Sequence, residues 1–262
     1  MITNPFTRHT INAFCSTGTG GGIDPSCSPG SSIVSKWAAK RFKDPAHAKA
    51  FVEWFGDSKV VDENGEPMMV YHGTKGKDFD EFWTTENYDF GAHFGNLDQA
   101  SLFNDQGNSG SRTYPVYLNI ENPIRLPDLG GWDWSTVTKA LKEKGIEVPP
   151  EVENERLQQK PGKEYQKWAM GKLQGIIENS GYDGIIYLNA AEGVDHTALS
   201  RERMKRMTSF GDNPVIPDDV MRGLGATDSW ISLRPTQIKS ATSNRGTYDR
   251  SNARINNQRG VS

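Results

Sequence analysis

One short apolar run, broken by the sequence His-Gly-Thr, constrains the fold of this chain most. Residues Met68–Tyr71 are apolar, follow Pro67 and lead directly into His72, Gly73 and Thr74. A compact run of this length, bounded by proline and glycine, favours a buried strand over a helix. A strand that ends there places an imidazole and a hydroxyl beside a backbone that glycine leaves open to a polar ligand. The alternative is a histidine whose hydrogen bonds are satisfied within the fold at the end of a strand.

A helix is expected before this strand, because both of its ends are marked. Asp44 can cap the helix, Pro45 suits its first turn and Gly56 suits its end. Four apolar residues recur at helical spacing and form one stripe: Ala48, Phe51, Val52 and Phe55. We expect this stripe to pack on the sheet of the domain; a partner protein is the alternative.

Alternation and short apolar runs predict the other strands. They cover residues 90–95, 113–120, 183–188 and 229–233, and a hairpin turned at 64–65 precedes Met68. Asn96 and Gln99 have the spacing of a capping box for a short helix that runs to Phe103. A longer helix is expected at 163–180, with Gly181 beyond its end.

Two polar segments are expected to be insertions. Residues 128–160 hold one predicted helix, at 135–144, and no residues that we connect with chemistry. Residues 194–227 concentrate positive charge on a predicted short helix that carries Arg201, Arg203, Lys205 and Arg206. This helix presents either a solvated face or a surface for an acidic target, nucleic acid included.

Two further loop segments differ in their aromatic content. Residues 75–88 are polar but carry three aromatic side chains, those of Phe79, Phe82 and Trp83. Such a loop can lie across a ligand. The chain from Asn244 onward is polar, and we expect it to be frayed.

Length and charge bound the class of protein. The chain has 262 residues, enough for one domain with appendages, and no apolar run of it approaches the roughly 20 residues of a membrane span. Its net charge of −3 gives no overall signal for nucleic acid or a membrane surface. We expect a cytoplasmic protein without a membrane partner, because the N-terminus lacks a basic start followed by an apolar core.

Residues 1–35 are rich in Gly, Ser, Thr and Pro and hold both cysteines, Cys15 and Cys27. Because so few apolar groups cannot offset the entropy of ordering, we expect a flexible arm. Two cysteines in such an arm indicate neither a disulfide framework nor a metal site, so no metal is expected. The glycine-rich stretch at 17–22 lacks the Gly-Lys-Ser/Thr ending of a P-loop.

Four motifs occur in one order along the chain and carry a resemblance to a known family. They are Tyr71–Thr74, Asp89–Gly95, Gly181–Gly193 and Asp228–Ala241. Together they resemble the ADP-ribosyltransferase domains of phage-encoded and polyvalent proteins, on the His-Tyr-Glu side of that superfamily. The resemblance covers roughly residues 58–248, and residues 12–27 are similar to leaders of phage head-morphogenesis proteins.

The resemblance implies an α+β fold, the ADP-ribosyltransferase-like split fold of two packed, mostly antiparallel β-sheets with flanking helices. The chain then divides into a flexible arm at 1–35, a helical lead-in at 36–57, a catalytic domain at 58–248 with insertions at 128–160 and 194–227, and a polar tail at 249–262.

In the chemistry that the resemblance implies, NAD is a substrate and its nicotinamide–ribose bond breaks as positive charge develops on the sugar. His72 would hydrogen-bond the ribose on the adenosine side. Backbone groups of Gly73 would bind the nicotinamide carboxamide, and Thr74 would assist in the same pocket.

The family places an aromatic ring, normally tyrosine, on the nicotinamide. This chain offers His93 and Phe94 at that motif, and we choose Phe94 with Phe90 as its neighbour. The resemblance also places Asn189 and Gln237 among the residues of the NAD site.

A catalytic glutamate normally begins the last strand in the family, and Ser229 stands at that place in this chain. Two carboxylates lie near it in the motifs, those of Glu192 and Asp228. Either can stabilise a charged sugar. We choose Glu192 first, because of its reach from a loop end and its company with Asn189.

The resemblance implies a mono-ADP-ribosyltransferase that moves ADP-ribose from NAD to a protein or nucleic acid. We expect a phage-encoded effector that acts in the host cytoplasm and associates with the virion. The rival hypotheses are a non-catalytic virion or interaction protein that retains the fold, and an NAD hydrolase. Ser229 and Phe94 favour the non-catalytic rival, whereas His72, Gly73, Thr74 and Glu192 oppose it.

Overall fold

A computed structural model describes residues 29–76, 78–85, 89–103, 110–154, 162–209, 214–245 and 248–256. The predicted flexible arm lies outside the described residues as far as residue 28. For its last part the prediction is wrong, because helix α1 (Pro29–Arg41) begins there. Val34 and Ala38 of α1 are buried in one cluster with helix α2 (Pro45–Phe55), so apolar burial offsets the entropy of ordering. None of the described helices has the length and apolar character needed to span a membrane.

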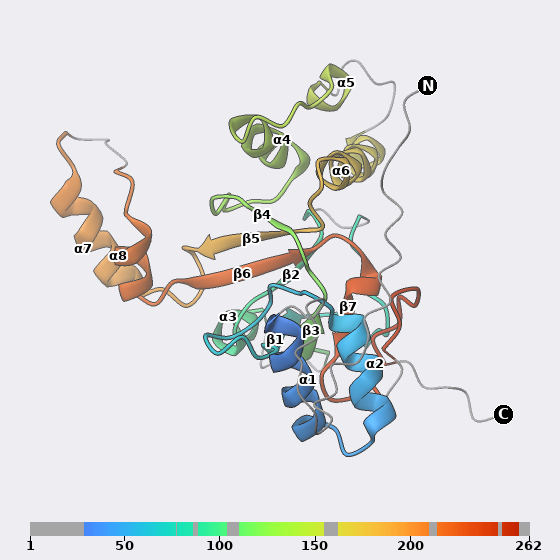
Figure 1. The fold of residues 1–262 in the computed structure, drawn as a ribbon. Coiled ribbons are helices and arrows are strands. Elements are labelled where there is room, and N and C mark those ends of the chain that lie inside the picture. The colour runs from blue at the N-terminus through green and yellow to red at the C-terminus, as the bar shows by residue number, and fades with distance from the viewer. Residues whose placement is uncertain are drawn as a thin grey trace.

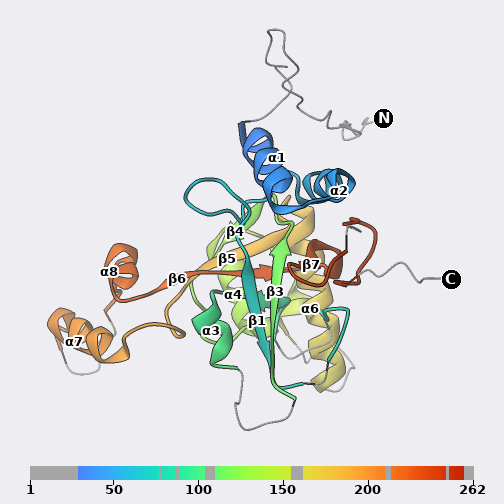
Figure 2. The same cartoon turned by 90° about the horizontal axis from the view of Figure 1, so that it is seen from below.

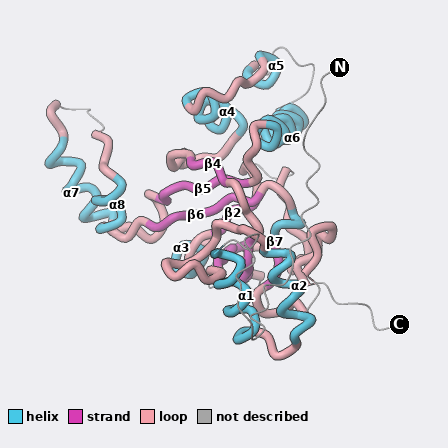
Figure 3. Tube along the Cα trace, in the orientation of Figure 1, coloured by secondary structure: helices cyan, strands magenta, loops and turns pink. Residues whose placement is uncertain are grey.

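Two β-sheets form the centre of the molecule (Figures 1 and 3). The smaller sheet is antiparallel and has the order β1 (Val70–Thr74), β3 (Arg112–Leu118), β7 (Ile238–Ser240). The larger has the order β2 (Ala92–Phe94), β6 (Thr227–Ser232), β5 (Gly184–Asn189), β4 (Pro123–Arg125), and its β4–β5 pair is parallel. The predicted mixed α+β class with two sheets is confirmed.

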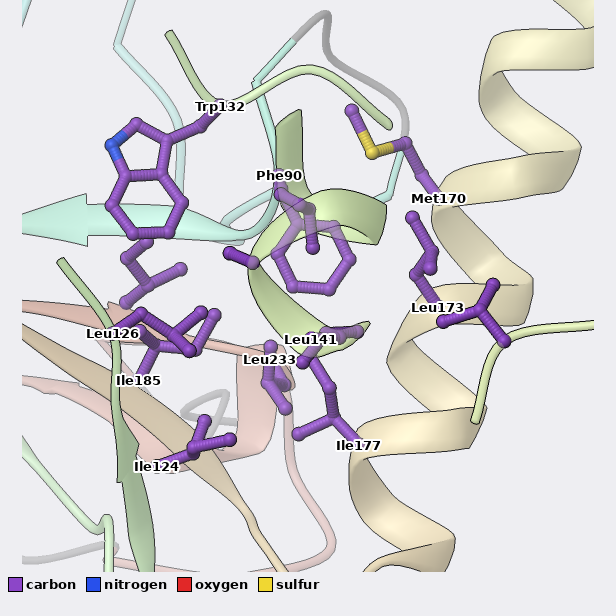
Figure 4. Close-up of a cluster of buried hydrophobic side chains, with 14 of the residues drawn as sticks. Phe90, Ile124, Leu126, Trp132, Leu141, Met170, Leu173, Ile177, Ile185 and Leu233 are labelled. Atoms are coloured by element: carbon purple, nitrogen blue, oxygen red, sulfur yellow. The ribbon is translucent and has the colours of Figure 1, made fainter. Parts of the chain in front are cut away.

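Buried side chains of both sheets belong to one hydrophobic cluster. They include Val70, Val116, Leu118 and Ile238 from the smaller sheet and Phe94, Ile186 and Trp230 from the larger. Successive side chains of a strand point to opposite faces, so Ile185 and Ile231 lie on the other face of the larger sheet. That face is covered by α4 (Trp134–Glu143), α5 (Pro150–Glu153) and α6 (Gly162–Asn179), as Figure 4 shows for α6.

Helix α2 covers the smaller sheet. Asp44 caps it, Pro45 begins it and Gly56 ends it, as the sequence predicts. Phe51 is fully buried, and its ring centroid lies 5.2 Å from that of Tyr117 on β3. The expected apolar stripe therefore packs on the sheet of the domain.

Helices α7 (His196–Arg206) and α8 (Asp218–Gly223) stand away from the two sheets (Figures 1 and 2). Leu199 and Met221 join them in a small buried cluster at the end of β5. Lys205 and Arg206 both pair with Glu202, at 3.2 and 2.9 Å. The expected basic helix is thus present and exposed, and an acidic target for it stays the alternative to a solvated face.

The main differences from the predicted elements concern the first strand, two short strands and the C-terminal tail. The first strand starts at Val70 and continues through Thr74, because pairing with β3 extends it beyond the apolar run. Strands β4 and β7 were not predicted, since three residues are too few for a periodic signal. The prediction of a polar, frayed tail from Asn244 onward is wrong for Tyr248 and Ile255, which are buried in two hydrophobic clusters.

Candidate functional site

A cavity of about 840 Å³ opens along the edges of both sheets, a volume typical of small-molecule sites. Its walls come from β1, β2, α3 (Leu97–Ser101), the ends of β5 and β6, and the segments 75–76, 78–83 and 128–132. Six of the predicted site residues line it: His72, Gly73, Thr74, Phe94, Asn189 and Glu192. Motifs that lie far apart in the sequence therefore meet in one space.

The imidazole of His72 has a defined tautomer. Its Nδ1 lies 2.8 Å from the carbonyl oxygen of His93. A carbonyl only accepts, so Nδ1 carries the hydrogen and Nε2 keeps a lone pair. Burial lowers the pKa of His72, and the bond to the His93 carbonyl opposes that effect only in part. His72 is therefore neutral at pH 7, and its Nε2 is a hydrogen-bond acceptor.

Gly73 lies where α3 crosses β1. A Cβ atom at this position would be 1.9 Å from the carbonyl oxygen of Ala100. The close approach of α3 is thus a second reason for glycine at this position, while access of a ligand to the Gly73 backbone stays a prediction. Thr74 accepts from the backbone N–H of Gly76 at 3.0 Å and still has a hydroxyl proton to donate.

Asn189, at the end of β5, holds the carboxylate of Glu192. Its Oδ1 accepts from the backbone N–H groups of Ala191 and Glu192, at 3.0 and 2.9 Å. Its Nδ2 must therefore point the other way, where it donates to Glu192 Oε2 and, at 3.1 Å, to Ser229 Oγ. The Asn189–Glu192 element predicted from the sequence is one hydrogen-bonded unit.

Gln99 extends this unit into α3. The capping box predicted from Asn96 and Gln99 is present. In addition, Gln99 Oε1 accepts from Ser229 Oγ at 3.3 Å, and Gln99 Nε2 donates to the carbonyl oxygen of Glu192 at 3.4 Å. Because each donor faces an acceptor, Gln99, Ser229 and Asn189 fix the loop that carries Glu192.

His93, Tyr187 and Trp132 form an aromatic group beside Glu192. The ring centroid of Trp132 lies 4.7 Å from that of Tyr187 and 5.6 Å from that of His93. His93 Nε2 lies 3.0 Å from the Phe90 carbonyl, so Nδ1 is free to accept from the Tyr187 hydroxyl at 3.5 Å. Burial, and next the carboxylate of Glu192, raise the pKa of Tyr187 well above its usual value.

We expect stability to fall as the pH is lowered through the range set by His93. Burial lowers the pKa of this imidazole to about 4. The unfolded chain, with a histidine pKa of about 6.5, then binds more protons than the folded one between pH 6.5 and 4, so the stabilisation present above pH 6.5 is lost in that window. The loss is about 3 kcal/mol at most, because the ring keeps some exposure in the cavity. Urea unfolding at pH 7 and pH 5 measures roughly half of this loss, because pH 5 lies inside the window; the same pH dependence in His93→Gln would contradict the assignment.

The insertion at 128–160 was predicted to hold no site residues, but the structure brings its first residues, 128–132, to the cavity. Asp128 lines the cavity and accepts from the backbone N–H groups of Gly130 and Ala190, at 2.9 and 2.8 Å. Trp132 lines it too. The available signal was the glycine pair that turns the chain just before an aromatic residue. Within the described residues, no group of three or more His, Cys, Asp or Glu side chains is placed to hold a metal ion.

Asp228, the second predicted carboxylate, lies outside the cavity lining. It pairs across the sheet with Leu188, whereas Ser229 pairs with Tyr187. Neighbouring residues of a strand face opposite sides, so Asp228 points away from the cavity. There it forms ion pairs with Arg125 and Arg222, at 3.0 and 2.9 Å.

Phe90 and Gln237 also lie outside the cavity lining. Phe90 is only 1% exposed and belongs to the cluster between the larger sheet and α6 (Figure 4). Gln237 is buried at the turn before β7, where its Nε2 donates to the carbonyls of Asn119 and Asp183, at 3.0 and 2.8 Å. Phe94 does line the cavity, and its ring lies 5.7 Å from that of His72.

The segments that build the cavity fall within one family match. The family model that describes the ADP-ribosyltransferase in polyvalent proteins matches residues 62–248. The chain belongs to this family. No curated protein and no solved structure matches it. The predicted family is therefore confirmed, whereas the phage type and the head-morphogenesis leader stay predictions.

Membership in the ADP-ribosyltransferase family gives the cavity a chemical context. The family implies ADP-ribosyl transfer from NAD to an acceptor. All six predicted residues that line the cavity lie inside the matched range. Helices α1 and α2 and the segment after Tyr248 lie outside it.

Proposed function

We propose that this protein transfers ADP-ribose from NAD to a macromolecular acceptor and releases nicotinamide, with Glu192 as the catalytic carboxylate. The observation that carries the proposal is that His72 and Glu192 line one cavity, where Asn189 holds the carboxylate of Glu192. Family membership supports the class of reaction. Fold alone would not carry it, because one fold hosts many functions.

In the proposed step, the bond between ribose C1′ and the nicotinamide nitrogen breaks. Its electron pair leaves with nicotinamide, which becomes neutral, while positive charge develops on the ribose. The carboxylate of Glu192 stabilises that charge. A nucleophilic atom of the acceptor then bonds to C1′ and loses its proton to Glu192 or to water.

Electrostatics supports one orientation of NAD in the cavity. Lys75 is the only lysine or arginine among the described lining residues, and it follows the His72–Thr74 strand. Two lining carboxylates, Asp78 and Glu81, follow Lys75 closely in the chain, and Asp78 pairs there with Arg112 at 3.3 Å. Asp89, Asp128 and Glu192 also line the cavity, and all three act on the Tyr187 hydroxyl. We therefore place the anionic pyrophosphate towards Lys75 and the cationic nicotinamide towards the carboxylates, beside the ring of Trp132.

His72→Ala is expected to raise the Kd for NAD about tenfold, the scale of one lost hydrogen bond. The physical reason is that Nε2 of the neutral imidazole would accept from a ribose hydroxyl. Isothermal titration with NAD and with ADP-ribose measures the effect, and both ligands should lose affinity. His196→Ala on the exposed helix α7 is the control. An unchanged Kd for His72→Ala would remove His72 from the site.

Incubation of the purified protein with labelled NAD and a host lysate tests the proposed function. Label on a macromolecule, together with free nicotinamide, supports a transferase. Protease and nuclease treatment of the labelled product then distinguishes a protein acceptor from a nucleic acid. Nicotinamide without label transfer supports the NAD hydrolase instead.

The non-catalytic rival is favoured by Ser229, which stands where the family normally has its glutamate. The contact through Asn189 weakens that objection, because it brings the carboxylate of Glu192 and the hydroxyl of Ser229 to one amide. If the protein neither binds NAD nor releases nicotinamide, the rival is correct.

We propose further that the protein is a phage-encoded effector that works in the host cytoplasm and is carried by the virion. The resemblance of residues 12–27 to head-morphogenesis leaders supports this part. Mass spectrometry of purified particles tests it, and absence of the protein from them would contradict virion association.

A further inference from the structure

The C-terminal segment of residues 249–256, called here the C-terminal strap, is built into the fold. Ile255 is fully buried, and its N–H donates to the carbonyl of Asp80 at 2.7 Å. Its carbonyl accepts from the N–H of Ser240 on β7 at 3.1 Å. The strap therefore lies between β7 and the segment around Asp80, near the red end of the chain in Figure 1. It also lies beyond the matched range of the family, which ends at residue 248.

Lys239 anchors the strap through hydrogen bonds. Its side chain is fully buried on β7, and its ammonium group donates to the carbonyl oxygens of Asn252 and Arg254, at 2.5 and 2.9 Å. Burying an ammonium group is unfavourable unless it is hydrogen-bonded. Burial lowers the pKa of Lys239 to about 8, with Asp249 acting in the opposite direction. A buried lysine that binds two strap carbonyls is therefore an anchor rather than a solvated surface charge.

The strap in turn holds residues 78–83, called here the aromatic loop. Besides the Ile255–Asp80 hydrogen bond, Arg254 pairs with Asp80 at 3.6 Å and forms a β-bridge with Glu81. Ile255 and Phe82 belong to the same buried cluster. The strap thus contacts the loop through its backbone, through charge and through apolar packing.

The aromatic loop is one wall of the cavity. Five of its residues line the cavity: Asp78, Phe79, Glu81, Phe82 and Trp83. The ring centroid of Phe82 lies 5.0 Å from that of His72 and 5.2 Å from that of Phe94. Phe79 stacks on Tyr114 at 4.5 Å. A displacement of the loop would therefore open the wall against which His72 is packed.

We propose that the C-terminal strap, anchored by Lys239, positions the aromatic loop against His72 and thereby sets the affinity of the cavity for NAD. Lys239 is a positioning residue, since it acts through the strap and the loop and does not line the cavity. The ligand in this inference rests on the proposed function, whereas the coupling of strap and loop does not.

Lys239→Met tests the anchor, because methionine fills the buried space and leaves the carbonyls of Asn252 and Arg254 without their donor. Hydrogen exchange measured by mass spectrometry is expected to become at least about tenfold faster in peptides that cover the aromatic loop and the strap. The Kd for NAD, measured well below the melting temperature, is expected to rise about tenfold. Lys49→Met, on the exposed face of α2, is the matched control and should change neither.

Ile255→Ala is the second variant, in case Lys239→Met does not fold. It keeps the backbone bonds of the strap and removes apolar contact with the cluster that holds Phe82, so the loop peptides should again exchange faster. A purely structural anchor would lower the melting temperature and leave the Kd of the folded protein unchanged, which would overturn the inference. Failure of the wild-type protein to bind NAD would contradict the proposed function, while the exchange rates would still decide whether the strap holds the loop.

Discussion

Glu192→Gln is expected to lower the rate of ADP-ribosyl transfer by about 10³-fold, the scale on which loss of one preorganised electrostatic group lowers kcat. Glutamine has the size of glutamate, and its side-chain oxygen can still accept from Asn189 Nδ2, so the loop should keep its position. Only the negative charge that stabilises the ribose is removed. Release of labelled nicotinamide and transfer of label measure the rate, and titration with NAD should give a Kd close to that of the wild type.

Asp228→Asn is the matched control, because Asp228 faces Arg125 and Arg222 outside the cavity. This variant should keep its turnover. Normal turnover in Glu192→Gln together with loss in Asp228→Asn would reverse the assignment of the carboxylate.

A further variant moves the carboxylate from position 192 to position 229. Ser229 Oγ and Glu192 Oε2 share the Nδ2 group of Asn189. A glutamate at position 229 would therefore extend from the neighbouring strand towards the same part of the cavity. The double variant Ser229→Glu, Glu192→Gln is expected to transfer ADP-ribose at least about tenfold faster than Glu192→Gln alone, because the site requires a positioned negative charge. If the rate did not rise, a carboxylate near Asn189 would not be sufficient, and its position at residue 192 would be required.

Gly73→Ala is expected to lower the free energy of unfolding by about 3 kcal/mol or more, since overpacking against a backbone forces main-chain shifts. A Cβ atom there would be 1.9 Å from the carbonyl oxygen of Ala100, and neither β1 nor α3 can give way as a flexible side chain could. Urea unfolding measures the change. NAD binding should weaken as well, because α3 carries Gln99 and with it the contact to the Glu192 loop.

Gly131→Ala is the matched control for this second prediction. Gly131 lines the same cavity, but a Cβ atom there meets nothing within 4 Å. Its stability should therefore match that of the wild type. If Gly73→Ala were as stable as the wild type and lost only NAD affinity, glycine would be required there for ligand access, as the sequence alone suggested.

The sequence was most informative where one element is bounded by residues with a single local role. Asp44, Pro45 and Gly56 mark α2 within the chain itself, and Asn96 with Gln99 marks the start of α3. These signals act over one or two helical turns, so they do not depend on the rest of the fold. The motifs that carry the family resemblance were recognisable for the same reason, because each is a continuous stretch.

The sequence was least informative about which side of a sheet a residue faces. Asp228 and Ser229 are neighbours in the chain, and the register of β6 against β5 decides that Ser229 faces the cavity. A shift by one residue would exchange the two, because side chains alternate along a strand. Phe90 and Phe94 are separated for a different reason, because Phe90 lies before β2 and before the turn at Gly91, and only Phe94 lines the cavity.

Two features were decided by tertiary contacts that the local signals of these segments do not encode. Asp128 and Trp132 reach the cavity from a segment that looks like a polar insertion, because β4 pairs with β5 and delivers them there. Lys239 on β7 and Ile255 in the C-terminal strap look like surface and tail residues, yet each is fully buried.

By itself the sequence predicted the family, the α+β class and the motifs that carry His72, Asn189 and two candidate carboxylates, since these depend on residue types in continuous stretches. The tertiary structure alone decided which carboxylate faces the cavity, what fills the space beside Gly73 and which segments complete the walls. Those outcomes depend on strand register and on contacts between distant segments, whose free energy comes from burial and pairing that no local pattern encodes.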